Sequence, residues 1–423
     1  MADLPFDLRL TSITAYRGVE FKTDVDSDFT EAPGVLAEVR EDQEQFSQEF
    51  QLHGANGDLI WVGGLFYLYE NDDFKIGMQS PFFGQLMFGT PDFGMQTIAS
   101  VKTNAYAAYV QGDYALNDRL SATAGIRYSY EKKSLDKIDA IFVGGFDVTF
   151  GGLTQETSVD WNAWTPKFGL QYEVSSDILV YASVTRGFKS GGFNPDPALI
   201  QSSFDPEYLW AYEAGVKSDW LDNRFRINVG AFYYDYTDLQ IQRIPSEGET
   251  PGLILENASD STIKGFEVEV TARPVPQLDL SAGVAYLDTT YKEFMTARPN
   301  APTVPVDVSG NRLNNAPKWS INLAGQYNQN IPNYGTLSLR GEYAWQDSVF
   351  FTFFNDPVMR QDSYGFLNAR VSFTTIEGHW QVAIYGHNLT DEVYYSNMAD
   401  GPFGVLGQIN PPKTYGVQIR YSY

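Results

Sequence analysis

The chain has 423 residues, with no cysteine and only three histidines, and it has no apolar run of about 18 residues. The lack of cysteine excludes disulfides and thiolate chemistry. The lack of a long apolar run excludes a transmembrane helix but not barrel strands, whose apolar signal is weaker. Basic residues are scarce: 29 Lys and Arg against 53 Asp and Glu give a net charge of −24. Since no basic stripe is present, we expect no nucleic-acid partner.

Motifs for catalysis and cofactor binding are also missing. His379 and His387 lie on the same face of one strand-like stretch. At about 3.3 Å per residue, however, they are too far apart to bind one metal. The glycine-rich stretch Gly187–Gly192 lacks the spacing and the following helix of a phosphate loop. We therefore expect no enzyme activity, no metal site at these residues and no cofactor.

Aromatic residues, in contrast, are abundant: 27 Tyr, 29 Phe and 8 Trp. Such a composition suits a protein anchored at two membrane–water interfaces, although aromatic residues also favour ordinary strands. The last stretch, Lys413–Tyr423, alternates in period two, which places one apolar set on one face of a strand. That set is Tyr415, Val417, Ile419, Tyr421 and Tyr423. The closing strand of an outer-membrane barrel, with lipid on one face and water on the other, has this pattern.

Sixteen stretches resemble strands, and we expect no helix of consequence. The stretches are residues 8–21, 43–53, 59–70, 100–114, 119–130, 157–172, 177–188, 206–219, 224–240, 261–273, 277–292, 316–328, 335–349, 363–374, 379–389 and 413–423. Strands this long match tilted membrane crossings better than strands of soluble domains.

The connections between these stretches alternate without exception between long ones of 13 to 29 residues and short ones of 3 to 6 residues. Antiparallel neighbours place every second connection at the same end, and short turns opposite long loops are typical of outer-membrane barrels. The sequence therefore predicts an all-β, transmembrane, antiparallel up-and-down barrel in a single domain over residues 1–423. We expect the short turns in the periplasm and the long loops outside the cell.

Two predicted loops carry unusual compositions. Residues 22–42 are rich in Asp and Glu, which is typical of a solvated loop, with a hard-cation site as the alternative. Residues 71–99 are apolar for a loop, and we expect them either to contact a partly apolar ligand or to form a self-packed hairpin extension. We place the candidate ligand-contact residues in this loop and in the glycine-rich loop after residue 188. They are Phe82, Phe83, Met87, Phe88, Phe93, Lys189, Phe193 and Asn194.

Six segments in order resemble recurring segments of one family. They are Leu179–Asn194, Glu207–Lys217, Ala231–Leu239, Gly310–Trp319, Tyr385–Asp391 and Pro412–Tyr423. Together they resemble the β-barrel portion of TonB-dependent outer-membrane receptors. That resemblance implies energised uptake of a scarce ligand, most often a ferric siderophore, captured by extracellular loops and an internal plug. The resemblance also implies three partners: the outer-membrane lipid, the TonB–ExbB–ExbD system and the barrel-assembly machinery. In this family the assembly machinery recognises a terminal aromatic strand such as this one.

The sequence departs from this family at its beginning. The first residues show no export signal, no TonB-contacting box and no plug, and the sixteen strands are fewer than the family's barrel of about twenty-two. We therefore expect an N-terminally truncated receptor barrel. Two alternatives stay open at this point: a passive channel of sixteen strands closed on themselves, and a soluble all-β binding protein.

Overall fold

The computed structural model describes residues 2–5, 7–26, 34–149, 153–194, 203–243, 254–298, 301–401 and 404–423. Its dominant feature is one 18-stranded antiparallel sheet, and each of the sixteen predicted stretches forms a strand of it. These strands are β2 (Leu8–Asp26), β3 (Leu36–Asn56), β4 (Leu59–Gln79), β5 (Phe93–Ala115), β6 (Leu120–Val143), β8 (Leu153–Ser175), β9 (Ile178–Lys189), β12 (Glu207–Trp220), β13 (Phe225–Arg243), β14 (Ile254–Val275), β15 (Leu278–Glu293), β18 (Trp319–Ile331), β19 (Gly335–Gln346), β22 (Tyr364–Thr375), β23 (Trp380–His387) and β26 (Thr414–Tyr421).

Shorter strands complete the fold. Within the main sheet, β1 (Ala2–Leu4) pairs with β2, and β7 (Phe146–Asp147) pairs with β6. Four separate two-stranded ribbons lie in the longer connections. They are β10–β11 (Gly192–Phe193, Ser203–Phe204), β16–β17 (Met295–Arg298, Ala301–Asp307), β20–β21 (Val349–Phe350, Arg360–Gln361) and β24–β25 (Tyr395–Gly401, Gly404–Ile409).

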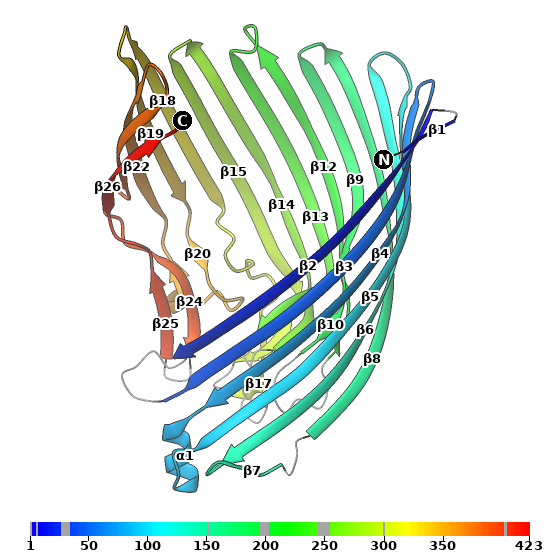
Figure 1. The fold of residues 1–423 in the computed structure, drawn as a ribbon, viewed down its shortest axis with the longest axis vertical. Helices are drawn as coiled ribbons and strands as arrows, with labels where there is room; N and C mark the ends of the chain where they lie inside the picture. Colours follow the sequence, from blue (N-terminus) through cyan, green and yellow to red (C-terminus); the bar gives the residue numbers. More distant parts are fainter. Residues whose placement is uncertain are drawn as a thin grey trace.

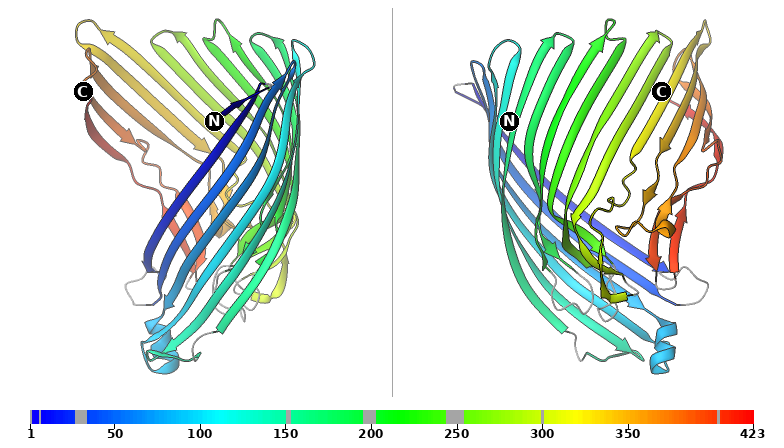
Figure 2. Two further views of the ribbon diagram at one scale, coloured as in Figure 1. Left: turned by 45° about the vertical axis from the view of Figure 1, so that its right-hand side comes forward. Right: turned by 180° about the vertical axis from the view of Figure 1, so that it is seen from behind.

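The long strands form a meander in which each pairs with its neighbours along the chain, and they curve around a hollow (Figures 1 and 2). Among the described residues, β26 pairs only with β23, and β2 pairs only with β1 and β3. The described wall therefore has two free edges. It does not close through β2 and β26, which counts against a self-closed channel of sixteen strands.

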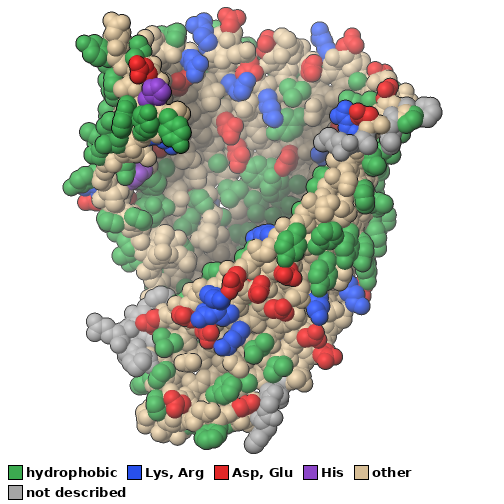
Figure 3. Space-filling model, viewed as in Figure 1, with side chains coloured by type: hydrophobic (Ala, Val, Ile, Leu, Met, Phe, Trp, Pro, Cys, Tyr) green, Lys and Arg blue, Asp and Glu red, His purple; other side chains and the backbone are tan. Residues whose placement is uncertain are grey.

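The pleat gives this wall two chemically different faces. Cross-strand partners share a face, and Phe50, Leu65, Ala108, Tyr128 and Trp164 are successive partners on β3, β4, β5, β6 and β8. The rings of Tyr128 and Trp164 are 4.7 Å apart. We call this the outer face, because Figure 3 shows hydrophobic side chains on the outside of the wall and charged side chains lining its hollow. The opposite, inner face carries residues such as Glu49 and Ser129, as expected for a wet interior.

Two predicted loops are largely strand, so those boundaries were wrong. β2 runs to Asp26 and β3 starts at Leu36, while β4 runs to Gln79 and β5 starts at Phe93. The pairing of β4 with β5 continues through all these positions without a register shift. Backbone hydrogen bonds and cross-strand side-chain pairs hold these extensions together. The two faces of the extensions do not differ in polarity, so the alternation of apolar and polar residues that marks a strand in the sequence is missing there. Residues 71–99 thus form the hairpin extension that was one of the two expectations.

The expectation of no helix was also wrong, because α1 (Pro81–Phe88) forms at the tip of the β4–β5 hairpin. Ser80 caps its start with a side-chain oxygen that accepts from the Phe83 N–H, and Pro81 occupies the first turn. Gly89 ends it in the left-handed region at a φ of 70°. A 3-10 turn, η1 (Pro357–Met359), lies between β20 and β21. In the described part of the chain, no helix has the length and apolar character needed to cross a membrane.

Candidate functional site

The candidate site is the end of the wall that carries the long connections, which we call the mouth. Its most apolar part is the aromatic tip, which we define as Phe82, Phe83, Met87, Phe88 and Phe93 on and beside α1. Four of these side chains are exposed, by 62%, 41%, 59% and 50% in chain order, and Phe93 is partly buried. The ring of Phe93 lies 5.1 Å from that of Phe83 and stacks at 5.4 Å on that of Phe88. The tip therefore presents a preformed apolar surface to solvent.

The helix is held close to its hairpin by a glycine. Gly84 is buried, and a Cβ at this position would lie 2.6 Å from the Cβ of Phe93 and 2.6 Å from the Thr90 carbonyl oxygen. Only a residue without a side chain allows this approach. The hydroxyl of Ser80 also donates to the Gly34 carbonyl at 2.7 Å, which ties the start of α1 to the segment before β3. The aromatic tip is thus fixed at one place on the rim.

The other three candidate residues lie on the connection between β9 and β12. Lys189 is exposed and pairs in register with Glu207, and Phe193 is half-buried in the β10–β11 ribbon. Asn194 is 5% exposed, and its amide bonds the backbone of Leu255 twice, donating at 2.8 Å and accepting at 2.7 Å. The structure therefore gives Asn194 an anchoring position against β14 and leaves Lys189 the more accessible of the three.

Side chains that the sequence did not single out fix this connection to the inner face. The Gln240 amide donates to the carbonyls of Ser190 and Asp205, both at 3.0 Å, and Trp161 donates to the Asp205 carboxylate at 3.2 Å. Lys133 donates to the Gly191 carbonyl at 2.9 Å. These residues come from β13, β8 and β6. No sequence pattern links them, since their meeting depends on how the connection folds back into the hollow.

A second packed unit, the loop cluster, forms on the opposite side of the mouth. Its buried members are Tyr291, Phe294, Val308 and Phe353, which are 1%, 1%, 2% and 9% exposed. The Phe294 ring lies 5.4 Å from Tyr291 and 5.0 Å from Phe353. The aromatic run at residues 350–354 was a sequence signal for such packing that we did not use.

An ion pair links the two connections that form the loop cluster. Arg298 donates to both carboxylate oxygens of Asp356, at 2.6 and 2.8 Å, and its guanidinium lies 4.4 Å from the ring centre of Phe354. A bidentate pair restricts geometry as well as adding energy. The connection between β15 and β18 and the connection between β19 and β22 are thereby joined into one body.

Acidic groups gather on the inner face where β3 and β4 extend beyond the predicted membrane crossing. Burial and the nearby carboxylates, beginning with Glu41 and Glu70, raise the pKa of Asp72 to about 6. One oxygen of this carboxylate is buried and makes no hydrogen bond. In the part of the chain that the structure describes, no group of three His, Asp or Glu is arranged to hold a metal ion, and residues 27–33 of the stretch predicted as a hard-cation site lie outside that part.

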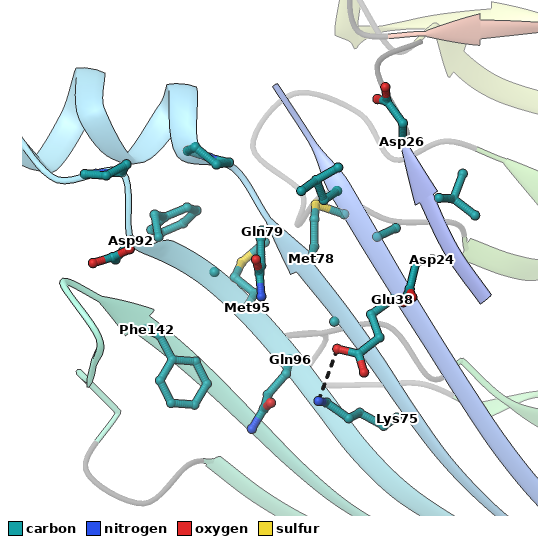
Figure 4. A pocket seen from close by; sticks show the side chains of 18 of the residues that line it. Asp24, Asp26, Glu38, Lys75, Met78, Gln79, Asp92, Met95, Gln96 and Phe142 are labelled. Carbon is teal, nitrogen blue, oxygen red and sulfur yellow. Dashed lines mark hydrogen bonds and ion pairs between the residues drawn. The ribbon is translucent and has the colours of Figure 1, made fainter. Parts of the chain in front are cut away.

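The mouth also has a cavity of about 660 Å³ beside α1, at the ends of β2 to β6 (Figure 4). Met78 and Met95, which are register partners, and Phe142 contribute to its lining. Lys75 and Glu38 form an ion pair of 3.3 Å at its border and belong to the outer face. Phe93 of the aromatic tip also lines this cavity, so the cavity borders the outer face of the wall and adjoins one of the candidate contact residues.

The closing strand shows the predicted alternation. Each of Tyr415, Val417, Ile419, Tyr421 and Tyr423 is more than half exposed, and Val417 and Ile419 pair with the outward Ile384 and Val382 of β23.

A wall of long antiparallel strands, with an apolar outer face, a polar inner face and long connections at one end only, defines the class of membrane β-barrels. The family follows from the sequence match: residues 2–389 match the family model for the TonB-dependent receptor-like β-barrel, so the chain belongs to the TonB-dependent receptors. Members of this family are transport receptors in the outer membrane of Gram-negative bacteria and not enzymes. They bind siderophore-type ligands and interact with TonB.

Similar curated proteins are named as receptors for metal-pseudopaline, ferric pyoverdine or pesticin. The metal-pseudopaline receptor CntO of Pseudomonas aeruginosa is 26% identical over 259 residues, which are 61% of this chain and 32% of that receptor. The pesticin receptor of Yersinia pestis is 23% identical over 350 residues, 78% of this chain and 46% of that receptor. The chain thus spans about a third to just under half of these relatives.

Solved structures of the family show the same fold. The ferric yersiniabactin uptake receptor FyuA of Yersinia pestis superposes with a TM-score of 0.81 at 19% identity, covering 99% of this chain and 59% of that one. The siderophore receptor PiuA of Acinetobacter baumannii gives a TM-score of 0.75 at 16% identity, covering 100% and 63%. The predicted fold class is therefore confirmed.

Proposed function

We propose that this chain is the barrel wall of an outer-membrane receptor for TonB-dependent uptake of a ferric siderophore or a similar iron complex. The family match over residues 2–389 carries this proposal. Relatives named for pyoverdine, pesticin and pseudopaline support the ligand class. With the long connections outside the cell, the mouth faces the medium and the short turns face the periplasm.

In this proposal the aromatic tip makes the first contact with the ligand. Siderophores present apolar or aromatic groups around a chelated metal, and exposed aromatic side chains on a fixed hairpin offer a matching surface at low entropic cost. Phe83 and Phe88 already pack on Phe93, so little side-chain freedom remains to be lost on binding. Lys189, exposed at the end of β9, supplies a cation for an anionic complex.

The partners follow from the same proposal. Outer-membrane lipid covers the outer face, the TonB–ExbB–ExbD system energises release of the ligand, and the barrel-assembly machinery reads the closing strand. The exposed apolar set Tyr415, Val417, Ile419, Tyr421 and Tyr423 supports the contacts with lipid and with the assembly machinery, because every member is more than half exposed.

A binding experiment tests ligand capture. The chain, folded in detergent micelles, is titrated with a panel of ferric siderophores while tryptophan fluorescence is recorded. We expect saturable binding of at least one complex, and about tenfold weaker binding when Phe82, Phe83, Met87 and Phe88 are changed together to serine. The matched control changes Tyr334 and Ile376, which are 70% and 66% exposed in the short turns, to serine.

The outcomes separate two statements. If no ferric complex binds the folded chain, capture by this wall is contradicted. If a complex binds but the serine variants of the tip and of the short turns bind it equally well, the receptor function stands and the aromatic tip is not the contact.

A further inference from the structure

Two arginines lie side by side on the inner face of the wall, in a chain whose net charge is −24. Arg340 of β19 and Arg370 of β22 are direct register partners, and we call them the arginine pair. Their neighbours Leu339 and Val371 are partners on the outer face, 42% and 45% exposed, so the arginine pair points into the hollow. Figure 3 shows Lys and Arg side chains lining that hollow. Like charges on neighbouring strands repel, so this arrangement is unfavourable unless an anion meets both cations.

The arginine pair lies midway along the wall. Arg340 and Arg370 are each five positions from the short-turn ends of their strands, Gly335 and Thr375. At about 3.3 Å per residue and a tilt of about 45°, the pair is about 12 Å from that end of the wall. It is therefore separate from the candidate contact residues at the mouth.

Two other arginines of the inner face show how a structural cation is usually satisfied. Arg226 donates to both carboxylate oxygens of Asp219, at 2.6 and 3.1 Å. Arg9 donates to the carboxylate of Asp3 at 3.0 Å. Each of these two guanidinium groups thus has a carboxylate of its own.

The arginine pair has one carboxylate between its two cations. Arg340 donates to Glu342 at 2.6 Å and to the amide oxygen of Gln326 at 3.4 Å. Arg370 donates to the amide oxygen of Gln418 at 2.6 Å, and no carboxylate among the described residues pairs with it. One positive charge of the pair is therefore not balanced by the wall.

A cavity of about 350 Å³ opens beside the arginine pair, a volume in the range of small-molecule sites. Tyr385 and His387 also line it, with their rings 5.3 Å apart. The Tyr385 ring lies over Gly416, where a Cβ would be 2.7 Å from the tyrosine hydroxyl, so the absence of a side chain there makes room for the ring. Guanidinium groups and aromatic rings line one cavity, which suits an organic anion better than an inorganic ion.

A second cavity, of about 450 Å³, shares Arg340 with the first and extends to Arg224 and Arg273 at the short turns. The charged lining of the two cavities together consists of four arginines and two carboxylates, Asp279 and Glu342. This lining has an excess of two positive charges, opposite in sign to the net charge of the chain. The arginine pair therefore lies in the part of the inner face that attracts anions.

We propose that the arginine pair binds a small organic polyanion with at least two carboxylates, either free or bound to a metal as a chelate. Each guanidinium takes one carboxylate in the bidentate geometry that its planar fork fits, and the two arginines are one strand, about 4.8 Å, apart. The carboxylates replace the amide oxygens of Gln326 and Gln418 as partners. The role of the site in transport rests on the proposed function, because a complex captured at the mouth meets the arginine pair on its way to the periplasm.

The test measures binding of citrate, and separately of ferric citrate, to the chain folded in detergent micelles by titration calorimetry at pH 7.5. Changing Arg340 and Arg370 together to glutamine should weaken binding about tenfold, and rising salt should weaken binding by the unchanged chain. Changing both to lysine keeps the charge but loses the planar fork, so we expect binding about threefold weaker. The matched control changes Arg9 and Arg226 to glutamine, which removes the same charge from the inner face and should leave binding unchanged.

The two probes identify the recognised form: binding of both supports recognition of the carboxylates alone, and binding of ferric citrate only supports recognition of the chelate. The site is overturned if neither probe binds, if the glutamine variant of the arginine pair binds as tightly as the unchanged chain, or if the control loses as much. It is also overturned if acetate, with one carboxylate, competes as well as citrate.

Failure of the site and failure of the proposed function give different results. A chain that binds citrate through the arginine pair but binds no ferric complex contradicts capture by the wall and leaves the site standing. A chain that binds ferric siderophores but binds citrate equally well without the arginine pair overturns the site alone. Should the double glutamine variant lack heat-modifiable gel mobility, Arg370→Gln replaces it, with about threefold weaker binding expected.

Discussion

The two sides of the mouth are built on different principles. On the β2–β6 side, strands run past the last aromatic row as paired hairpins, and the apolar side chains at their end are exposed. On the β15–β22 side, the connections fold into the loop cluster, where Tyr291 and Phe294 are 1% exposed. Backbone ladders hold the first side, and side-chain packing holds the second.

This difference assigns different roles to the two sides. A paired hairpin tolerates the loss of single side chains, because its hydrogen bonds come from the backbone. A small packed cluster does not, because each member fills space that no neighbour can replace. We infer that the hairpin side is free to vary the chemistry it offers a ligand, while the cluster side braces the rim.

The strongest test of this contrast is Phe294→Ala. Removing a ring that is 1% exposed and lies 5.0 Å from Phe353 should cost about 3 to 4 kcal/mol of local stability. Hydrogen exchange should become faster in residues 304–313 and 349–359. The matched change Phe82→Ala, at an exposed ring of α1, should leave exchange in β4 and β5 unchanged. If Phe82→Ala and Phe294→Ala increased hydrogen exchange equally, the two sides of the mouth would not differ in how they are held together.

A smaller effect is expected from Arg298→Ala or Asp356→Ala. The two side chains are 38% and 30% exposed, so solvent weakens the pair, and we expect a loss of about 1 to 2 kcal/mol measured as local exchange. A double-mutant cycle should give a coupling energy of about 1 kcal/mol. The exposed pair of Arg360 and Asp362 serves as the control, with coupling near zero. If the two cycles gave the same coupling, the bidentate geometry would contribute nothing.

On the hairpin side, one substitution should stabilise the wall. The pKa of Asp72 is raised from 3.8 to about 6, so the folded chain binds this proton more tightly than the unfolded chain does. Stability therefore falls as pH rises from about 4 to about 6, and the full penalty persists above that range. Asp72→Asn should raise stability by about 1 kcal/mol at pH 7.5, after allowance for solvent screening, and by little at pH 4.

Heat-modifiable gel mobility at the two pH values measures this difference. A benefit that was the same at both pH values would show that the carboxylate charge is not its cause. Stabilisation by Asp72→Asn at pH 4 but not at pH 7.5 would be the opposite of the expected pH dependence. The control is Asp58→Asn, in the short turn between β3 and β4 at the other end of the strand.

Much of the wall could be predicted from the sequence, because the pleat requires alternation wherever one face meets lipid and the other meets water. All sixteen strands follow from that pattern. The predictions failed where lipid no longer covers the outer face: at Asn71, Asp72 and Asp73 both faces are polar, yet pairing continues. The helix had a readable signal in Ser80, Pro81 and Gly89, but its eight residues are too few for apolar periodicity.

The site was less predictable than the wall. The aromatic tip was recognised because apolar residues are unusual in a loop, and its role in ligand contact stays a prediction. Asn194, placed in the same set, is buried against β14, and its role in ligand contact also stays a prediction. The loop cluster joins residues from two separate connections, such as Phe294 and Phe353. Local sequence carries no information about which connections meet.

The smallest effect is expected at the aromatic tip itself. Phe88 is 50% exposed and stacks on Phe93, so Phe88→Ala removes one exposed aromatic contact, for which we expect less than about 0.5 kcal/mol. Hydrogen exchange in the outermost pairs, Gln79 with Gly94 and Met78 with Met95, measures whether the hairpin opens. Unchanged exchange is expected, because backbone pairing holds these strands. Faster exchange along the whole extension would mean that the tip braces the hairpin as the loop cluster braces its own side, and the two sides of the mouth would then share one principle.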